Sequence, residues 1–127
     1  MLNKEILKNG RDLLLKLHKV FVDLERSAYE SIHGVLTPGQ FLNVLIENED
    51  LSWLRKMSML IVDIDEMFDA KDGISETDVD ANLAKLRSLV HLSDVDEIFA
   101  AKYEHCLTKS PEAVELQGRL LEVLAVN

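Results

Sequence analysis

Apolar residues that recur every three or four positions are the feature that most limits how this chain can fold. Near the amino terminus they fall on one stripe of a helix, formed by Leu7, Gly10, Leu14, Leu17, Phe21, Leu24 and Ala28. No segment keeps the period-two alternation that is typical of half-buried strands. The sequence therefore predicts an all-α protein, with residues 1–127 forming a single domain that is a bundle of five to six helices joined by short loops.

The first helix is expected to run to about His33, where Gly34 supplies a left-handed stop. The pair Asn9-Gly10 is a weak point, because it can end a short leading helix before the main one starts. The sequence leaves open whether residues 1–10 continue the first long helix.

Capping signals mark the later helices. The clearest is TPGQ at residues 37–40, where a threonine can cap, a proline fits the first turn and a glutamine can close a capping box. Further helices are expected to begin near Leu51, at Ser75 with Asp78, at Ser93 with Asp96, and at Ser110 with Pro111. The residues expected on the buried faces of the later helices or at the flanks of those faces include Leu42, Leu45, Ile46, Met59, Val62, Val95 and Ile98. Val126 is counted with the apolar residues that cover more than one face of the last helix.

Charge and cysteine content indicate which partners and compartments fit the chain. The net charge is −9, and an acidic protein repels the phosphates of nucleic acids, so we expect no nucleic-acid partner.

No run of about 18 apolar residues is present, so we expect no membrane-spanning segment. The charged start does not resemble a signal peptide. The single cysteine, Cys106, excludes an internal disulfide and fits a reducing compartment. A soluble cytoplasmic protein is predicted.

The acidic segment DIDEMFDAKDGISETDVD, residues 63–80, resembles a calcium-binding loop at its centre. When its glycine, Gly73, is aligned with the invariant glycine of an EF-hand, Asp72 occupies a ligand position, but Phe68, Ala70 and Val79 occupy three others. The segment is therefore interpreted as two helices joined by a turn. Its carboxylates are also a possible contact for a basic partner protein.

Glu30 and His33 are the candidate metal ligands, because a Glu-x-x-His step places both side chains one turn apart on a helix. Di-metal helical bundles use this step twice together with two further glutamates, and the sequence contains no second copy. We therefore expect no metal and no cofactor.

Catalytic motifs such as G-x-S-x-G, the P-loop, the Rossmann glycines and C-x-x-C are not found. Cys106 continues the apolar face of its helix, which favours a small core residue over a nucleophile. The sequence supports no enzymatic activity, although an active site assembled from distant residues stays open.

Two classes of function remain. The first is a non-catalytic interaction or scaffold protein that self-associates as a homodimer, because apolar residues cover more than one face of the last helix: Leu116, Leu120, Leu121, Val123 and Leu124. Insertion of that helix into its own core explains the same pattern. The second is a small-molecule or metal-binding bundle with a pocket between helices, and an enzyme is one form of this alternative. Its candidate ligand-binding residues are Arg55, Asp63 and Glu66.

Four segments together resemble a family of small uncharacterised bacterial proteins that are all-helical. These segments are LHKVFVDLERSAYESIHG (17–34), TPGQFLNVL (37–45), LSWLRKMSMLIVDIDEM (51–67) and FAAKYEHCLTKSPEAV (99–114). The resemblance implies a compact helical bundle of bacterial origin. It assigns no activity, cofactor or functional role to any residue.

Overall fold

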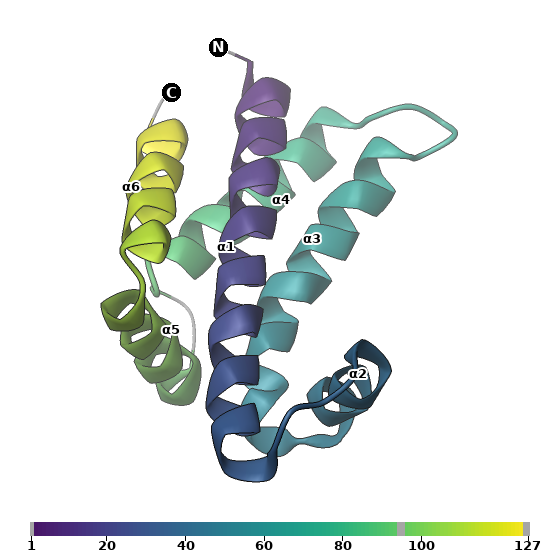
Figure 1. Cartoon of the computed structure of the whole chain (residues 1–127). Helices are drawn as coiled ribbons and strands as arrows, with labels where there is room; N and C mark the ends of the chain where they lie inside the picture. Colours follow the sequence, from purple (N-terminus) through teal and green to yellow (C-terminus); the bar gives the residue numbers. More distant parts are fainter. Residues whose placement is uncertain (1, 94–95, 126–127) are drawn as a thin grey trace.

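A computed structural model describes residues 2–93 and 96–125, and in these ranges the chain forms helices and turns without any strand (Figure 1). The helices are α1 (Asn3–His33), α2 (Pro38–Glu47), a short 3₁₀ helix η1 (Glu49–Leu54), α3 (Arg55–Phe68), α4 (Glu76–Val90), α5 (Glu97–Lys109) and α6 (Pro111–Ala125). The predicted all-α bundle is confirmed. None of the helices in the described ranges has the length and apolar character needed to cross a bilayer.

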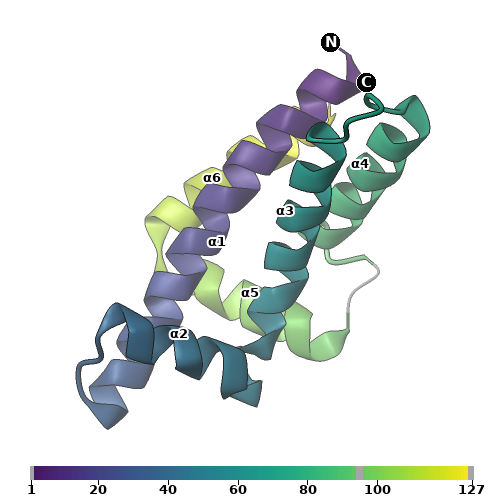
Figure 2. The ribbon, with the colours of Figure 1, turned by 90° about the vertical axis from the view of Figure 1, so that its right-hand side faces the viewer.

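The long helix α1 is the centre of the bundle, and α3, α4, α5 and α6 all pack against it (Figures 1 and 2). Its buried residues follow the predicted stripe: Ile6, Leu7, Gly10, Leu13, Leu14, Leu17 and Phe21. Beyond Phe21 the stripe leaves the core, since Leu24 is only half-buried and Ala28 is exposed. The last three turns of α1 therefore extend past the main core.

Asn9-Gly10 does not interrupt α1. Gly10 is buried, and a Cβ atom at this position would lie 2.8 Å from Cδ2 of Leu86 on α4 and 3.5 Å from Cδ2 of Leu124 on α6. The missing side chain thus lets three helices approach one another closely. Burial of Ile6 and Leu7 on the preceding turn outweighs the low helix propensity of glycine, so residues 3–10 belong to the first helix.

Several predicted helix ends are confirmed. Gly34 follows α1 with φ = 90°, a conformation that glycine adopts without strain. At the start of α2, the Thr37 hydroxyl accepts a hydrogen bond from the Gln40 backbone N–H (3.2 Å), and the Gln40 side chain accepts one from the Thr37 N–H (2.9 Å). Ser110 caps α6 by accepting from the Ala113 N–H (3.1 Å).

Two predicted starts need correction. The cap of α5 is Asp96, whose carboxylate accepts from the Phe99 N–H (2.7 Å), whereas Ser93 donates to the Ser88 carbonyl of the preceding helix (3.3 Å). The segment expected to begin a helix at Leu51 starts as the 3₁₀ helix η1 and becomes α-helical only from Arg55.

Part of the predicted core is also wrong. Five apolar residues expected to face or flank the core are more than half exposed: Leu42, Ile46, Met59, Val62 and Ile98. The reason for the first two is that α2 is short: it buries only Phe41, and Leu45 is half-buried against the core. The predictions for Val95 and Val126 lie outside the described residues.

Aromatic rings fill the core where α1, η1 and α5 meet. Phe21 lies between Trp53 and Tyr103, with ring centroids 5.6 and 5.0 Å away, and Phe99 contacts both of these partners. The Tyr103 hydroxyl donates to Oε1 of Gln117 on α6, and the Gln117 side-chain amide donates to the Val90 carbonyl of α4 (3.0 Å). One partly buried chain of hydrogen bonds therefore connects α5, α6 and α4.

Replacing Gly10 tests the close approach of the three helices. Gly10→Leu should lower the free energy of unfolding by about 2–3 kcal/mol, because the new side chain overpacks the core. Gly118→Ala is the matched control: Gly118 lies in α6 with no heavy atom within 4 Å of an added Cβ, so better helix propensity should raise the stability by about 0.5–1 kcal/mol. Urea denaturation measures the free energy of unfolding of both variants. A Gly10→Leu variant as stable as the wild type would contradict the close approach of α1, α4 and α6 at Gly10.

Removing the Tyr103 hydroxyl tests the partly buried hydrogen-bond chain. Tyr103→Phe should destabilise the fold by about 1–2 kcal/mol, because Oε1 of Gln117 is left without its donor. The double variant Tyr103→Phe/Gln117→Leu removes both polar partners, and it should recover part of that loss. The measurement is again urea denaturation, and equal stability of Tyr103→Phe and wild type would argue against the contact.

Candidate functional site

Glu30 and His33, the candidate metal ligands, each contact other side chains or backbone. The Glu30 carboxylate accepts from the Leu36 N–H (2.7 Å) and lies 3.5 Å from Nε of Arg26. The His33 ring stacks on Tyr29, with 4.2 Å between centroids. In the described part of the chain no three His, Cys, Asp or Glu side chains are grouped as a metal site. Glu30 instead anchors the turn between α1 and α2.

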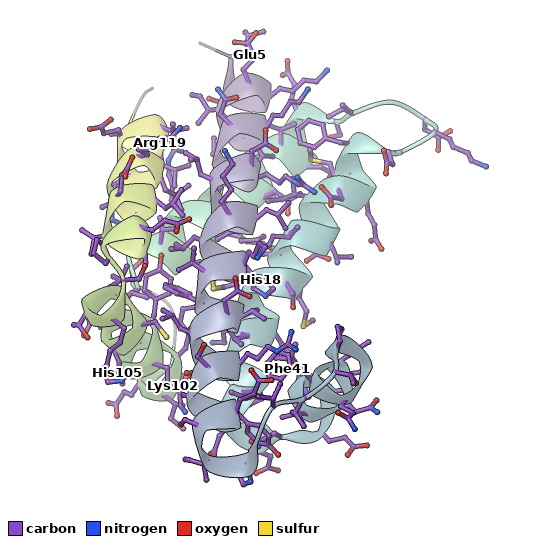
Figure 3. All side chains as sticks on the ribbon, in the orientation of Figure 1. Glu5, His18, Phe41, Lys102, His105 and Arg119 are labelled. Carbon is purple, nitrogen blue, oxygen red and sulfur yellow. The ribbon has the colours of Figure 1, made fainter. Side chains whose placement is uncertain are left out.

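Arg26, which the sequence did not single out, completes this anchor. Its guanidinium donates to the Leu36 carbonyl (2.7 Å) and lies 5.3 Å from the centroid of the Phe41 ring, which points from α2 toward α1 (Figure 3). Together with the capping box at Thr37, these contacts fix where α2 leaves α1. Hydrogen bonds to backbone atoms thus hold α2 in place together with the burial of Phe41.

The acidic segment 63–80 forms the end of α3, a turn and the start of α4, as predicted. Gly73 has φ = 92° in the turn, and Ser75 caps α4 by accepting from the Asp78 N–H (3.4 Å). One carboxylate, Asp65, receives two hydrogen bonds from the Arg11 guanidinium (2.7 and 2.8 Å), which ties α3 to α1 and raises the pKa of Arg11.

The three candidate ligand-binding residues on α3 do not converge. The Arg55 guanidinium donates to the Ile46 carbonyl, so it fastens the end of α2 to the start of α3. Asp63 lies two turns further along and borders a groove between α3 and α4, whereas Glu66 is exposed. These residues do not form one ligand site.

The last helix docks on its own bundle. Three of the five residues predicted as an interface are buried in the core of this chain: Leu116, Leu120 and Leu124. Leu121 and Val123 are half-buried and pack against that core. The apolar character of α6 is thus largely explained by burial within the chain.

Exposed apolar residues occur where α1 turns into α2, and we call the exposed side of residues 32–46 the corner surface. Its exposed apolar residues are Ile32, Val35, Leu42 and Ile46, which are 79%, 90%, 56% and 59% exposed. Residues 31–46 contain no Asp, Glu, Lys or Arg, although 29% of the whole chain is charged. Exposed apolar residues in an uncharged segment are typical of the central part of a protein interface. This uncharged run is the sequence signal that identifies the surface.

A groove of about 510 Å³ between α3 and α4, which we call the α3–α4 groove, is the second surface feature. Its lining combines apolar and polar side chains: Lys56, Met59, Leu60, Asp63, Ala84, Lys85, Ser88 and Leu89. Lys56 forms an ion pair with Asp96 (2.8 Å), whereas Lys85 forms no hydrogen bond or ion pair with any described residue. Asp63 likewise forms no hydrogen bond or ion pair with any described residue, so the groove offers apolar side chains together with one free charge of each sign.

Two other features lack a convergent set of functional groups. A wider hollow of about 850 Å³ lies beside the amino end of α1, and two of its polar side chains, Asn3 and Asp80, form a hydrogen bond with each other (3.0 Å).

Cys106 is buried, and burial raises the pKa of its thiol to about 11, so the thiol is protonated at neutral pH. His105 beside it is exposed on α5 (Figure 3). The burial of Cys106 and its protonated thiol support the prediction that it is a core residue.

Comparison with known proteins finds no matching family model and no curated protein or solved structure with significant similarity to this chain. The resemblance of residues 17–34 and the other three segments to a bacterial family stays a prediction.

His18 gives the fold a pH dependence. It lies midway along α1 and is half-buried (Figure 3), and burial lowers the pKa of its imidazole. Its contribution to stability is therefore complete above the pKa of the unfolded chain, about 6.5, and is lost as the pH falls through the lower folded-state pKa.

When the pH is lowered from about 7.5 to about 5.5, the free energy of unfolding of His18→Gln should accordingly fall by less than that of the wild type. Urea midpoints at the two pH values measure the difference. The exposed His105 provides the control, and His105→Gln should keep the wild-type dependence. If His18→Gln and wild type lose the same stability, His18 does not cause the effect.

Proposed function

We propose that the protein is a non-catalytic interaction protein of the cytoplasm that self-associates through the corner surface. The observation that carries this proposal is the exposure of Leu42 and Ile46 on a helix that has only Phe41 buried. Apolar side chains that stay exposed add little to the stability of a helix, and covering them with a partner is favourable. Leu42 and Ile46 keep more than half of their surface exposed in this chain.

A second copy of the chain is the partner that the charge distribution favours. Each copy carries a net charge of −9, so most parts of two copies repel each other. Residues 31–46 are free of charged side chains, so two copies can meet there without placing like charges in contact. A two-fold symmetric dimer is the commonest way to cover such a surface.

A small-molecule-binding function in the α3–α4 groove is the second candidate. The volume of the groove, about 510 Å³, lies within the usual range for ligand sites, and Lys85 and Asp63 offer a ligand one charge of each sign. Native mass spectrometry of the untagged protein distinguishes the two functions, because it reports a doubled mass for a dimer and an added small mass for a retained ligand.

Placing a charge on the corner surface should weaken the dimer. Leu42→Lys should raise the dissociation constant by about tenfold or more, because a charge is buried on both sides of a symmetric interface. Val114→Lys is a closely matched control, since Val114 and Leu42 are both 56% exposed and both changes add one positive charge, but Val114 lies on α6.

Sedimentation velocity over a range of concentrations measures both variants. Each lysine reduces the net negative charge, so simple repulsion predicts tighter association, the opposite of the expected result. A wild-type protein that stays monomeric at high micromolar concentration would refute self-association. If both variants weaken the dimer equally, the interface does not lie at the corner surface.

A further inference from the structure

The outer side of α3 carries a second group of exposed apolar residues, separate from the corner surface. α3 lies between α1 and α4 (Figure 2), and Met59 and Val62 at its middle are 64% and 51% exposed. Hydrogen bonds between Arg11 and Asp65 hold α1 beside α3. Leu15, which is 40% exposed, lies one turn from Arg11, and Val62 lies about one turn from Asp65 toward the same end of the bundle. Leu15 therefore extends the apolar group onto α1.

Four exposed residues of α3 have the spacing of a coiled-coil seam, and we call them the α3 face: Arg55, Met59, Val62 and Glu66. They are separated by four, three and four residues, and this spacing lets two helices pack together along one stripe. The buried residues of α3 lie on its other sides and pack within the chain. The α3 face thus has the form of a helix–helix contact that the described helices leave uncovered.

Charges are separated along the α3 face. Arg55 lies in the first turn of α3, the middle is apolar, and Glu66 lies in the last turn. This order is the reverse of the one that stabilises an isolated helix, because the amino end of a helix carries partial positive charge and the carboxyl end partial negative charge. The two residues are eleven positions apart, about 16 Å along the axis, so they do not pair within α3.

Neither charge of the α3 face is neutralised by a described residue. Glu66 forms no hydrogen bond or ion pair in the described ranges, and the Arg55 guanidinium donates to a backbone carbonyl but to no carboxylate. Beside the face, Lys56 and Asp63 repeat the same order of charges, although Lys56 is already paired with Asp96 (2.8 Å). A partner that suits this face is apolar at its centre and carries its charges in the opposite order.

We propose that the α3 face packs antiparallel against the α3 face of a second copy. A helix that runs in the opposite direction presents the same charges in the opposite order, so the face is complementary to itself. In this contact Met59 lies opposite Val62 of the other copy, and Arg55 lies opposite Glu66 of the other copy. Two-fold symmetry makes each of these contacts twice.

This contact goes beyond the proposed dimer, because it uses residues outside the corner surface. A chain that has both contacts possesses two separate two-fold interfaces, so it assembles past a dimer at high concentration. The fourteen residues of α3 span about 21 Å, and the α3 face is smaller than a standard interface of about 800 Å² on each partner. We therefore expect the α3 contact to be weak and to form at micromolar or higher concentration.

The test is made in Leu42→Lys, where the corner surface is blocked and the α3 contact is left. Adding Glu66→Arg should raise the dissociation constant of this protein by about threefold to tenfold, because Arg55 then faces an arginine at two symmetric positions. The matched control adds Glu104→Arg instead, which makes the same change of charge at an exposed position of α5 and should not weaken association. Both changes reduce the net negative charge, so simple repulsion predicts tighter association. Sedimentation velocity measures all three proteins.

Mixing two charge variants tests the antiparallel direction. Arg55→Glu and Glu66→Arg are made in separate proteins, both with Leu42→Lys. Each protein alone places like charges opposite each other, whereas a mixed dimer has an opposite pair at both ends. A 1:1 mixture should therefore associate about threefold to tenfold more tightly than either protein alone. Native mass spectrometry identifies the mixed species, and circular dichroism confirms that both variants are folded.

The outcomes separate the two proposals. If Leu42→Lys is monomeric at high micromolar concentration while the wild type is dimeric, the α3 contact is wrong and the corner surface stands. If Leu42→Lys associates as the wild type does and Glu66→Arg removes the association, the α3 contact stands and the corner surface fails. Equal effects of Glu66→Arg and Glu104→Arg, or a mixture that is no tighter than its components, would overturn the antiparallel contact. A monomeric wild type refutes both proposals.

Discussion

The apolar stripe of α1 is the surface on which the rest of the bundle is assembled. Leu7, Leu14, Leu17 and Phe21 are fully buried along it, and four other helices pack against this one helix. Burying side chains of this size stabilises the fold by roughly 1.5–3 kcal/mol each, so the stripe contributes strongly to stability. The closest approach is at Gly10, where α4 and α6 meet α1. Removing any one of these contacts affects several interfaces together.

The stripe also explains why α2 differs from the other helices. Because the buried part of α1 ends at Phe21, the last turns of α1 carry α2 away from the centre of the bundle. There α2 finds little apolar surface to cover, and Arg26, Glu30 and Arg55 hold it through hydrogen bonds to backbone atoms. The outward-facing Leu42 and Ile46 follow from this position, so the proposed contact surface is a result of how the core is arranged.

The sequence predicts the helices better than it predicts what they bury. Periodic leucines and the capping residues Thr37 and Ser110 define most helix boundaries, because these signals act within a few residues of the chain. Burial depends on which helices become neighbours, so Leu42 and Ile46 have the spacing of a buried face although no helix lies opposite them. The same limit applies to the candidate sites: Glu30 has the spacing of a metal ligand, but its partner is the backbone of a turn.

The polar attachment of α2 has a consequence for local stability. Segments with few buried apolar contacts open with less free energy than the core around them. The region from Gly34 to Asn48 contains a single buried side chain, Phe41, so its backbone amides should exchange with solvent before those of α1 or α3. A partner that covers α2 stabilises the closed form by mass action. In the proposed dimer that partner is a second copy, and the order of this segment then depends on the concentration of the protein itself.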